Sequence, residues 1–290
     1  MGLGPASVRL NLELYQRGIL KNVKSVVETG SQELHMRKDD FEQLIKSYGV
    51  PNYDGRKFEP WKFPERPRCS AKPFYQLLGA EKYTCIDLTG EHGAIQLDLN
   101  RPLEDKSYWG QYDLVTDHGC NEHAFNVTES YRTMHRLCKV GGILEICQAA
   151  WNGNGYFLFD KGFFESMAAA NNYKILFSSY SVTLNDNQNP FFRSQYHVPL
   201  AHNLLYALDN SKLQDIGICY VMQKQSSEDF KYAYELPYYM TGDGHFGYEV
   251  MFHVDPPARS YIPMASLEQF RIRDLVTQAG KKLRRKIFKK

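Results

Sequence analysis

Carboxylates recur at the ends of short apolar runs in this sequence, where they can accept hydrogen bonds from a bound ligand. Glu28 ends the first such run and is followed two residues later by Gly30. Asp87, Asp98 and Asp117 lie at or directly after the ends of three later runs. Carboxylate oxygens accept hydrogen bonds from ribose hydroxyls, and a glycine lets the backbone approach a polar group closely. These five residues therefore predict a nucleoside-binding site.

Two leucines accompany the acids, and one glycine motif is missing. Leu88 follows Asp87 and Leu99 follows Asp98, so each carboxylate has an apolar neighbour, and we expect the second pair to face the base of the nucleoside. The turn after Glu28 holds a single glycine and no GxGxxG. Dinucleotides need several glycines and an open helix N-terminus for their pyrophosphate, so the predicted ligand is not a dinucleotide.

His118 and His123 are candidates for a general base beside this site, because an imidazole accepts a proton near neutral pH. The alternative is that one of them braces the loop through hydrogen bonds. His118, Glu122 and His123 can also be considered as metal ligands. Their spacing matches no recognised metal motif, so we predict no metal site.

A second group of polar and aromatic residues suits a sugar-like ligand, since rings stack on sugars and amides bind hydroxyls. Asn152, Asn154 and Tyr156 follow the apolar run at 143–147, and Arg193 lies in the long connection before the last run. The alternative is that the aromatic residues of this region cover the edge of a sheet.

The elements that must position these residues alternate along the chain. Helical spacing of apolar residues predicts helices at 39–48, 73–78, 123–140 and 163–170, the third ending at Gly141 and Gly142. Short apolar runs predict strands at 23–28, 83–88, 95–99, 112–116, 143–147, 174–179 and 216–222. This alternation indicates an α/β protein with a parallel sheet covered on both faces. Ligands of such sheets bind outside the carboxyl ends of the strands, where the acids lie.

Three segments resemble class I S-adenosylmethionine-dependent methyltransferases, in a branch associated with sugar and polysaccharide modification. They are CIDL at 85–88, GAIQLDLNRP at 93–102 and YDLVTDHGCNEHAFN at 112–126. KVGG at 139–142 and GYFLFD at 155–160 are also similar. The resemblance covers about residues 20–225.

This resemblance implies a Rossmann-like, seven-stranded, mostly parallel sheet with an antiparallel last strand. It implies S-adenosyl-L-methionine as the cofactor, lying across the first, second and fourth strands. By position it assigns Glu28 and Gly30 to the methionine end, Asp87 to the ribose, and Asp98 with Leu99 to the adenine. The chain departs from the family in its glycine-poor first motif.

The resemblance also divides the chain. Residues 1–225 are the expected methyltransferase domain, interrupted by an irregular, proline-rich insertion at about 49–72. Residues 226–279 are a C-terminal extension that we expect to cover the acceptor site, and 280–290 are a basic tail.

The expected activity is methyl transfer to a hydroxyl of a sugar, nucleotide-sugar or glycan, by in-line displacement aided by a histidine base. A lipid or secondary metabolite is the alternative acceptor. A non-catalytic module that positions a partner enzyme is the alternative outside catalysis.

Composition sets the remaining expectations. The net charge of +2 gives no field for nucleic acid. No apolar run approaches the ~20 residues of a membrane span, and the first ten residues lack the apolar core of a secretory signal. The six cysteines form no CxxC pair and suggest reduced thiols. We therefore expect a cytoplasmic protein.

The tail KKLRRKIFKK carries seven Lys or Arg residues and no acid. As a helix it places Leu283 and Ile287 on one apolar strip, which suits peripheral contact with an anionic membrane at its inner face. The alternative is a solvated end without function.

Overall fold

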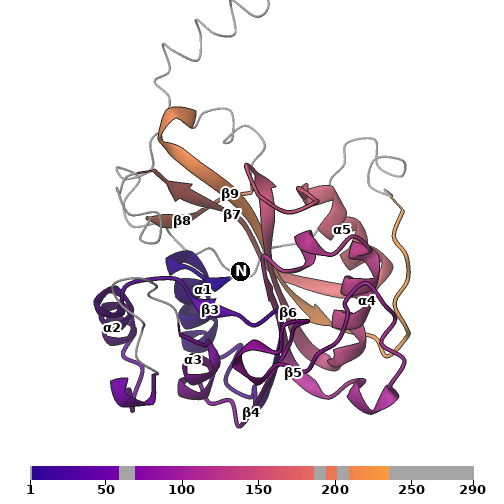
Figure 1. The fold of residues 1–290 in the computed structure, drawn as a ribbon, viewed down its shortest axis with the longest axis horizontal. Helices are drawn as coiled ribbons and strands as arrows, with labels where there is room; N and C mark the ends of the chain where they lie inside the picture. The colour runs from indigo at the N-terminus through magenta and orange to yellow at the C-terminus, as the bar shows by residue number, and fades with distance from the viewer. Residues whose placement is uncertain (1, 59–68, 186–193, 201–208, 235–290) are drawn as a thin grey trace, which may run out of the picture.

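The computed structural model describes residues 2–58, 69–185, 194–200 and 209–234. Within these ranges the centre of the molecule is a seven-stranded sheet (Figure 1). In spatial order its strands are β4 (Lys82–Ile86), β2 (Ser25–Thr29), β5 (Tyr112–His118), β6 (Cys138–Trp151), β9 (Leu213–Lys224), β7 (Tyr173–Leu184) and β8 (Gln195–Val198).

Five of these strands run in one direction. β4, β2, β5 and β6 pair in parallel. β7 is the fifth, because β9 is antiparallel to both β6 and β7. β9, the last strand of the described residues, is thus inserted between two strands of the opposite direction. The predicted α/β class and the mostly parallel sheet with an antiparallel last strand are confirmed.

Helices cover both faces of the sheet (Figure 1). Residues of α1 (Pro5–Gln16), α2 (Lys38–Ser47) and α3 (Lys72–Leu77) share one buried cluster with alternate residues of β2 and β5, such as Val26 and Leu114. Residues of α4 (Val127–Leu137) and α5 (Lys161–Ala170) share the other cluster with the intervening residues Val27 and Val115. Successive residues of each buried strand therefore contribute to both cores.

The N-terminus is tied to the sheet edge by a small second sheet. β1 (Gly2–Leu3) pairs in parallel with β3 (Glu33–Leu34), which follows the end of β2. α1 begins directly afterwards with Pro5, a residue suited to the first helical turn. Five short 3₁₀ turns complete the described elements: η1 (Gly55–Lys57), η2 (Glu91–Gly93), η3 (Lys106–Tyr108), η4 (Asn121–His123) and η5 (Asn210–Lys212).

The strand predicted at 95–99 is wrong. Only an isolated bridge between Ile86 and Ile95 joins this segment to the sheet. Asp98 accepts hydrogen bonds from the backbone N–H and the side-chain amide of Asn100, both at 2.9 Å. Such local bonds compete with a ladder, because they turn the backbone away from the neighbouring strand. β8, which was not predicted, supplies the seventh strand at the other edge.

The helix predicted at 123–140 is shorter at both ends. His123 lies in η4 rather than in the helix, α4 ends at Leu137, and β6 begins at Cys138. The buried ammonium of Lys224 donates to the carbonyl oxygens of His135 (2.7 Å) and Cys138 (3.1 Å). This contact satisfies the carbonyls at the end of the helix, so the glycines are not needed to stop it.

The expectation of six reduced thiols is wrong for one pair. Cys147 of β6 and Cys219 of β9 are directly opposite in the antiparallel register and are joined as a disulfide, with Cα atoms 4.2 Å apart. Directly opposed positions of neighbouring antiparallel strands bring side chains this close. Their pairing follows from a register that spacing in the sequence cannot reveal.

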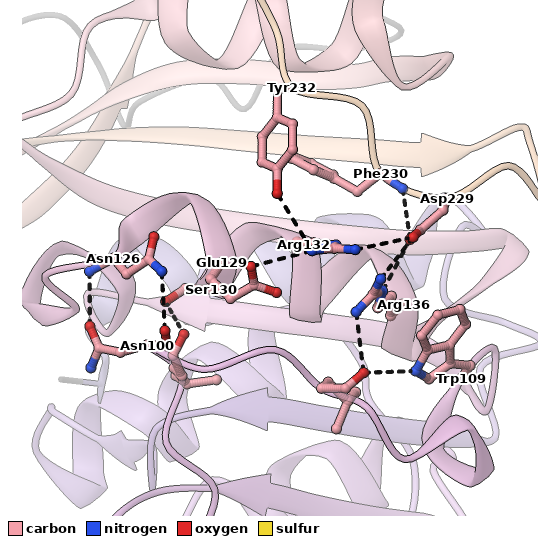
Figure 2. Close-up of polar contacts among 12 residues, drawn as sticks. Asn100, Trp109, Asn126, Glu129, Ser130, Arg132, Arg136, Asp229, Phe230 and Tyr232 are labelled. Carbon is pink, nitrogen blue, oxygen red and sulfur yellow. Dashed lines mark hydrogen bonds and ion pairs between the residues drawn. The ribbon is translucent and has the colours of Figure 1, made fainter.

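After β9 the chain returns along α4, as Figure 2 shows. Asp229 accepts two hydrogen bonds from Arg136, at 3.0 and 2.7 Å, and Arg136 also donates to the carbonyl of Leu103. The hydroxyl of Tyr232 and the carboxylate of Asp229 both lie 3.5 Å from Arg132. Bidentate arginine–carboxylate contacts fix orientation, so the first residues of the C-terminal extension are anchored on this helix.

The remaining predictions about chain ends lie outside the described residues. These are the course of 235–279 over an acceptor site, the basic tail, and the part of the insertion at 59–68. Among the described helices, none has both the length and the apolar character that crossing a membrane requires.

Candidate functional site

We call the position between the carboxyl ends of β2 and β5 the crevice, because open parallel sheets bind ligands where the strand order reverses. β2 pairs with β4 on one side and with β5 on the other, so the chain reverses its direction of progress across the sheet here. Gly30 after β2 and Gly119 after β5 both have a left-handed backbone, with φ of 81° and 75°. Glycine adopts this conformation without a steric cost, so both strands turn sharply at the point where such sheets bind ligands.

Asp87 forms one corner of this crevice. Its Oδ2 accepts a hydrogen bond from the backbone N–H of Ser31, and its Oδ1 accepts from the N–H and the hydroxyl of Thr89. Burial acts to raise the pKa of this carboxyl, but the hydrogen bonds outweigh it and the pKa is lowered. The neighbouring Leu88 side chain is 63% exposed. The corner therefore combines a charged, half-buried carboxylate with an uncovered apolar surface.

Glu28 does not lie at the surface of the crevice. Its side chain is fully buried, accepts a hydrogen bond from the Tyr83 hydroxyl, and lies 3.4 Å from the hydroxyl of Thr116. Burial raises its pKa to about 8, so the carboxyl is protonated at neutral pH. The Glu28 side chain thus points into the core of the ligand-free protein, and its assignment to the methionine end stays a prediction.

Asp117 is also buried, within β5 rather than after it. Its Oδ1 accepts hydrogen bonds from the backbone N–H groups of Cys120 (3.0 Å) and Asn121 (3.2 Å). Burial raises its pKa to about 7, against the effect of these bonds. Asp117 therefore stabilises the turn that contains Gly119, and its assignment to the cofactor site stays a prediction.

Asp98 and Leu99 lie on a loop joined to the start of α4. The backbone N–H of Asn100 donates to Asp98, and the side chain of Asn100 accepts a hydrogen bond from the backbone N–H of Asn126 (Figure 2). The Ser130 hydroxyl donates to the Leu99 carbonyl. Asp98 is partly exposed and Leu99 is almost covered. Their assignment to the adenine stays a prediction.

A polar pocket of about 370 Å³ opens on the other side of β5, at the same edge of the sheet. We call it the polar pocket, and its walls come from the N-terminal segment, the ends of β5, β6 and β7, and the starts of β8 and β9. Its described lining residues are Gly2, Gly4, Ser7, His118, Gly119, Glu122, Cys147, Gln148, Ala149, Asn152, Gly153, Asn154, Ser181, Thr183, Gln195, Gln214, Asp215, Ile216 and Gly217.

The two candidate histidines have different surroundings. His118 lines the polar pocket, is only 3% exposed, and neither of its ring nitrogens has a hydrogen-bond partner among the described residues. Its Nε2 lies 3.7 Å from Oε1 of Glu145. Burial lowers the pKa of His118 to about 3, so the ring is neutral at physiological pH. His123 has a side chain that is 41% exposed and is not among the described residues that line the pocket.

Two further residues shape the pocket: Glu122, which the sequence suggested only as a metal ligand, and Gln148, which the sequence did not single out. Glu122 accepts a hydrogen bond from the Ala149 N–H at 2.6 Å, and its carbonyl accepts from Tyr156 at 2.8 Å. The side-chain oxygen of Gln148 accepts from the Glu122 N–H at 3.0 Å, and the Gln148 side chain also interacts with the buried Asp117 carboxyl. The only sequence signal for Gln148 is its position, as a polar residue directly after the apolar run at 143–147.

The predicted sugar-binding residues separate into three groups. Asn152 and Asn154 line the polar pocket, although the Asn152 amide also donates to the carbonyl of Gln214 at 2.6 Å. Tyr156 is 70% exposed and stacks edge-on against Phe125, with ring centroids 5.8 Å apart. Arg193 lies outside the described residues.

The pocket is suited to hydroxyl-bearing ligands. Hydroxyl, amide and carboxyl side chains line it together with His118, whose two buried ring nitrogens make no hydrogen bond to a described residue. An unpartnered buried polar group costs about 1–3 kcal/mol, which a bound hydroxyl would offset. Within the described ranges, no group of three or more His, Cys, Asp or Glu residues is arranged to hold a metal ion.

Comparisons with known proteins concern the fold. No protein-family model matches the chain, and no curated protein matches its sequence at a significant level. Among solved structures it is similar to a Thermotoga maritima SAM-dependent methyltransferase described as a possible histamine N-methyltransferase (9% identity, 74% of this chain and 89% of that chain, TM-score 0.39). It is also similar to a putative methyltransferase from Bacillus halodurans (12%, 74% and 99%, TM-score 0.40). A third is the 1,6-didemethyltoxoflavin-N1-methyltransferase of Burkholderia thailandensis, solved with S-adenosylhomocysteine (10%, 77% and 80%, TM-score 0.37).

Proposed function

We propose that this protein is an S-adenosylmethionine-dependent methyltransferase that acts on a hydroxyl of a sugar-like acceptor. One observation carries the proposal: the crevice with Asp87 and the polar pocket with His118 open on the same sheet edge, on either side of β5. Two ligands bound there would meet at the end of one strand, as transfer between them requires.

The residues of the crevice fit the cofactor. Asp87 is ionised and uses three of its roughly four acceptor sites on Ser31 and Thr89, which leaves capacity for a ribose hydroxyl. Leu88 offers an exposed apolar side chain beside it, and Gly30 brings the backbone of β2 to the same corner. Bound S-adenosylmethionine would supply a methyl group on a positively charged sulfur.

The residues of the polar pocket fit an acceptor rich in hydroxyls. Ser181, Thr183 and Gln148 are buried side chains that can bind hydroxyl groups, and few apolar side chains line the pocket. This lining favours a sugar over a lipid. The neutral ring of His118 can accept a hydrogen bond from the acceptor hydroxyl and so position the oxygen that is methylated. Because its pKa of about 3 makes the ring a weak base in the free protein, proton uptake by His118 requires that the bound ligands raise this pKa.

Asp87→Ala is expected to weaken binding of S-adenosylhomocysteine by about tenfold or more, because it removes a charge-assisted hydrogen bond of about 1.5–3 kcal/mol. Asp87→Asn keeps the size of the side chain, and its affinity for S-adenosylhomocysteine is expected to lie between those of the unsubstituted protein and Asp87→Ala. Isothermal titration calorimetry measures both, and thermal melting shows whether each variant is folded. Unchanged affinity in a folded Asp87→Ala protein would remove Asp87 from the cofactor site.

Asp105→Ala is the matched control. Asp105 also caps a turn, by accepting a hydrogen bond from the Ser107 N–H at 2.9 Å, but it directly precedes η3 and lies outside the crevice. Its replacement should leave the affinity for S-adenosylhomocysteine within about twofold of the unsubstituted protein.

A protein that binds S-adenosylhomocysteine and transfers no methyl group would instead match the non-catalytic alternative, a module that positions a partner enzyme. His118 makes no hydrogen bond to a described residue, and its Nε2 lies 3.7 Å from the buried Glu145 carboxyl, so the ring is available to a ligand in the pocket, which favours catalysis.

A further inference from the structure

A second cavity, of about 280 Å³, adjoins the polar pocket, and we call it the arginine cavity. Its described lining includes Arg9 of α1, Arg37 and Asp40 at the start of α2, and Tyr196 of β8. Gln195 lines both this cavity and the polar pocket. The two hollows therefore meet at a single side chain.

Gln195 is held in place between the two cavities. Its Nε2 donates to the hydroxyl of Thr183 at 3.2 Å, and its Oε1 accepts from the backbone N–H of Ala6 at 3.4 Å. A Cβ atom at Gly4 would lie 2.1 Å from the same oxygen, so glycine is needed for this close approach. Gln195 is thus a fixed amide at the boundary that the two cavities share, with both of its polar atoms bonded.

Arg9 is the unusual residue of the arginine cavity. Its guanidinium makes no hydrogen bond to any described residue, and Nη1 is shielded from solvent. The guanidinium carbon lies 6.0 Å from the centroid of the Tyr196 ring, which orients the group without giving it an acceptor. Shielding a cationic donor without an acceptor is unfavourable, so the arrangement suits a ligand that provides negative charge.

The charges of the two cavities differ in sign. The charged residues among the described lining of the polar pocket are Glu122 and Asp215, with no lysine or arginine. The described lining of the arginine cavity has two arginines and one acid. A ligand that occupies both would place an uncharged, hydroxyl-rich end in the first and an anionic group in the second.

We propose that the arginine cavity is a second subsite, in which Arg9 binds an anionic group (phosphate or carboxylate) attached to the sugar that enters the polar pocket. The identification of that sugar as a methyl acceptor rests on the proposed function. The binding of the anion does not, because it can be measured without cofactor.

Binding of three probes to the cofactor-free protein tests this assignment: glucose, glucose 1-phosphate and glucuronic acid. We expect the protein to bind at least one of the charged sugars about tenfold or more tightly than glucose. Preference for the phosphate alone, the carboxylate alone or both identifies the anion. Equal binding of all three, or binding of none, would overturn the proposal.

Two substitutions of Arg9 and one control make the test specific. Arg9→Gln should abolish the preference for the charged sugar, and Arg9→Lys should keep part of it, because the lysine retains the charge without the planar donors. Arg17→Gln is the control: Arg17 directly follows the last residue of α1, and its side chain pairs with Glu13 outside the cavity. A folded Arg9→Gln protein that keeps the full preference would contradict the proposal. So would an equal loss in Arg17→Gln.

The test also separates this subsite from the proposed function. If S-adenosylhomocysteine binds and the charged sugar does not, the subsite is wrong and the cofactor site stands. If the charged sugar binds through Arg9 and S-adenosylhomocysteine does not, the subsite stands and methyl transfer is wrong.

Discussion

His118→Gln is expected to lower the turnover of methyl transfer by about 10²–10⁴-fold, while the affinity for S-adenosylhomocysteine stays unchanged. His118 lines the polar pocket with both ring nitrogens unpartnered in the described structure, and it belongs to the strand that separates this pocket from the crevice. Loss of the proton acceptor should therefore slow the reaction without altering the cofactor site. Steady-state kinetics and calorimetry measure the two effects separately.

His123→Gln is the matched control, because His123 lies five residues further on with an exposed side chain. Its turnover should remain within about threefold of the unsubstituted protein. The reverse pattern, with His123→Gln slow and His118→Gln normal, would make His123 the base. Normal turnover in both variants would show that positioning alone is sufficient for catalysis.

The pH dependence of turnover gives a further check on His118. Burial holds its pKa near 3, well below the usual value of 6.5, so the ring remains an unprotonated base down to about that pH. Turnover should therefore not fall between pH 7 and 5 through protonation of His118. A loss in that interval that disappears in His118→Gln would contradict the neutral, buried state of the ring.

The double variant Glu28→Gln/Glu145→Gln is expected to be more stable than the unsubstituted protein at pH 8, by a few kcal/mol in the free energy of unfolding. Both carboxyls are fully buried on the same face of the sheet, and burial raises the pKa of each to about 8 from 4.5. A raised pKa means that the folded state favours the protonated form. The stability from each acid is complete below pH 4.5 and is lost as the pH rises through about 8.

The difference in stability between the double variant and the unsubstituted protein should therefore grow from pH 5 to pH 8, because glutamine cannot ionise. Urea denaturation at several pH values measures it. Glu81→Gln is the control, since Glu81 is an exposed partner of Lys24 and should show little pH-dependent difference. A difference that is constant across this range would show that the buried acids do not ionise with raised pKa values.

The strands that flank the crevice could be predicted, because their limits depend on the local sequence. β2, β4 and β5 lie within two residues of their predicted limits, because buried parallel strands are short apolar runs ended by turn residues. Glu28 and Asp117 could not be separated from Asp87, however. Whether a side chain at a strand end points into the core or to the surface depends on the position of the last ladder pair, as the longer β5 shows.

The polar pocket could be predicted only in part, because distant segments form it. Asn152, Asn154 and His118 were identified, but Ser181, Thr183 and Gln195 reach the pocket through the pairing of β7 with β8 and β9. The contribution of the N-terminus was missed as well. α1 is buried around most of its circumference, including Asn11 and Leu12, so it shows no clear helical period of apolar residues.

Transfer of a labelled methyl group from S-adenosylmethionine to a panel of neutral and anionic sugars and lipids tests the central claim most directly. We expect the full chain to label at least one sugar, with the label lost in Asp87→Ala and His118→Gln and kept in His123→Gln. The same preparation should bind S-adenosylhomocysteine saturably. Failure to bind it and to label any acceptor would contradict the assignment of this protein as a methyltransferase.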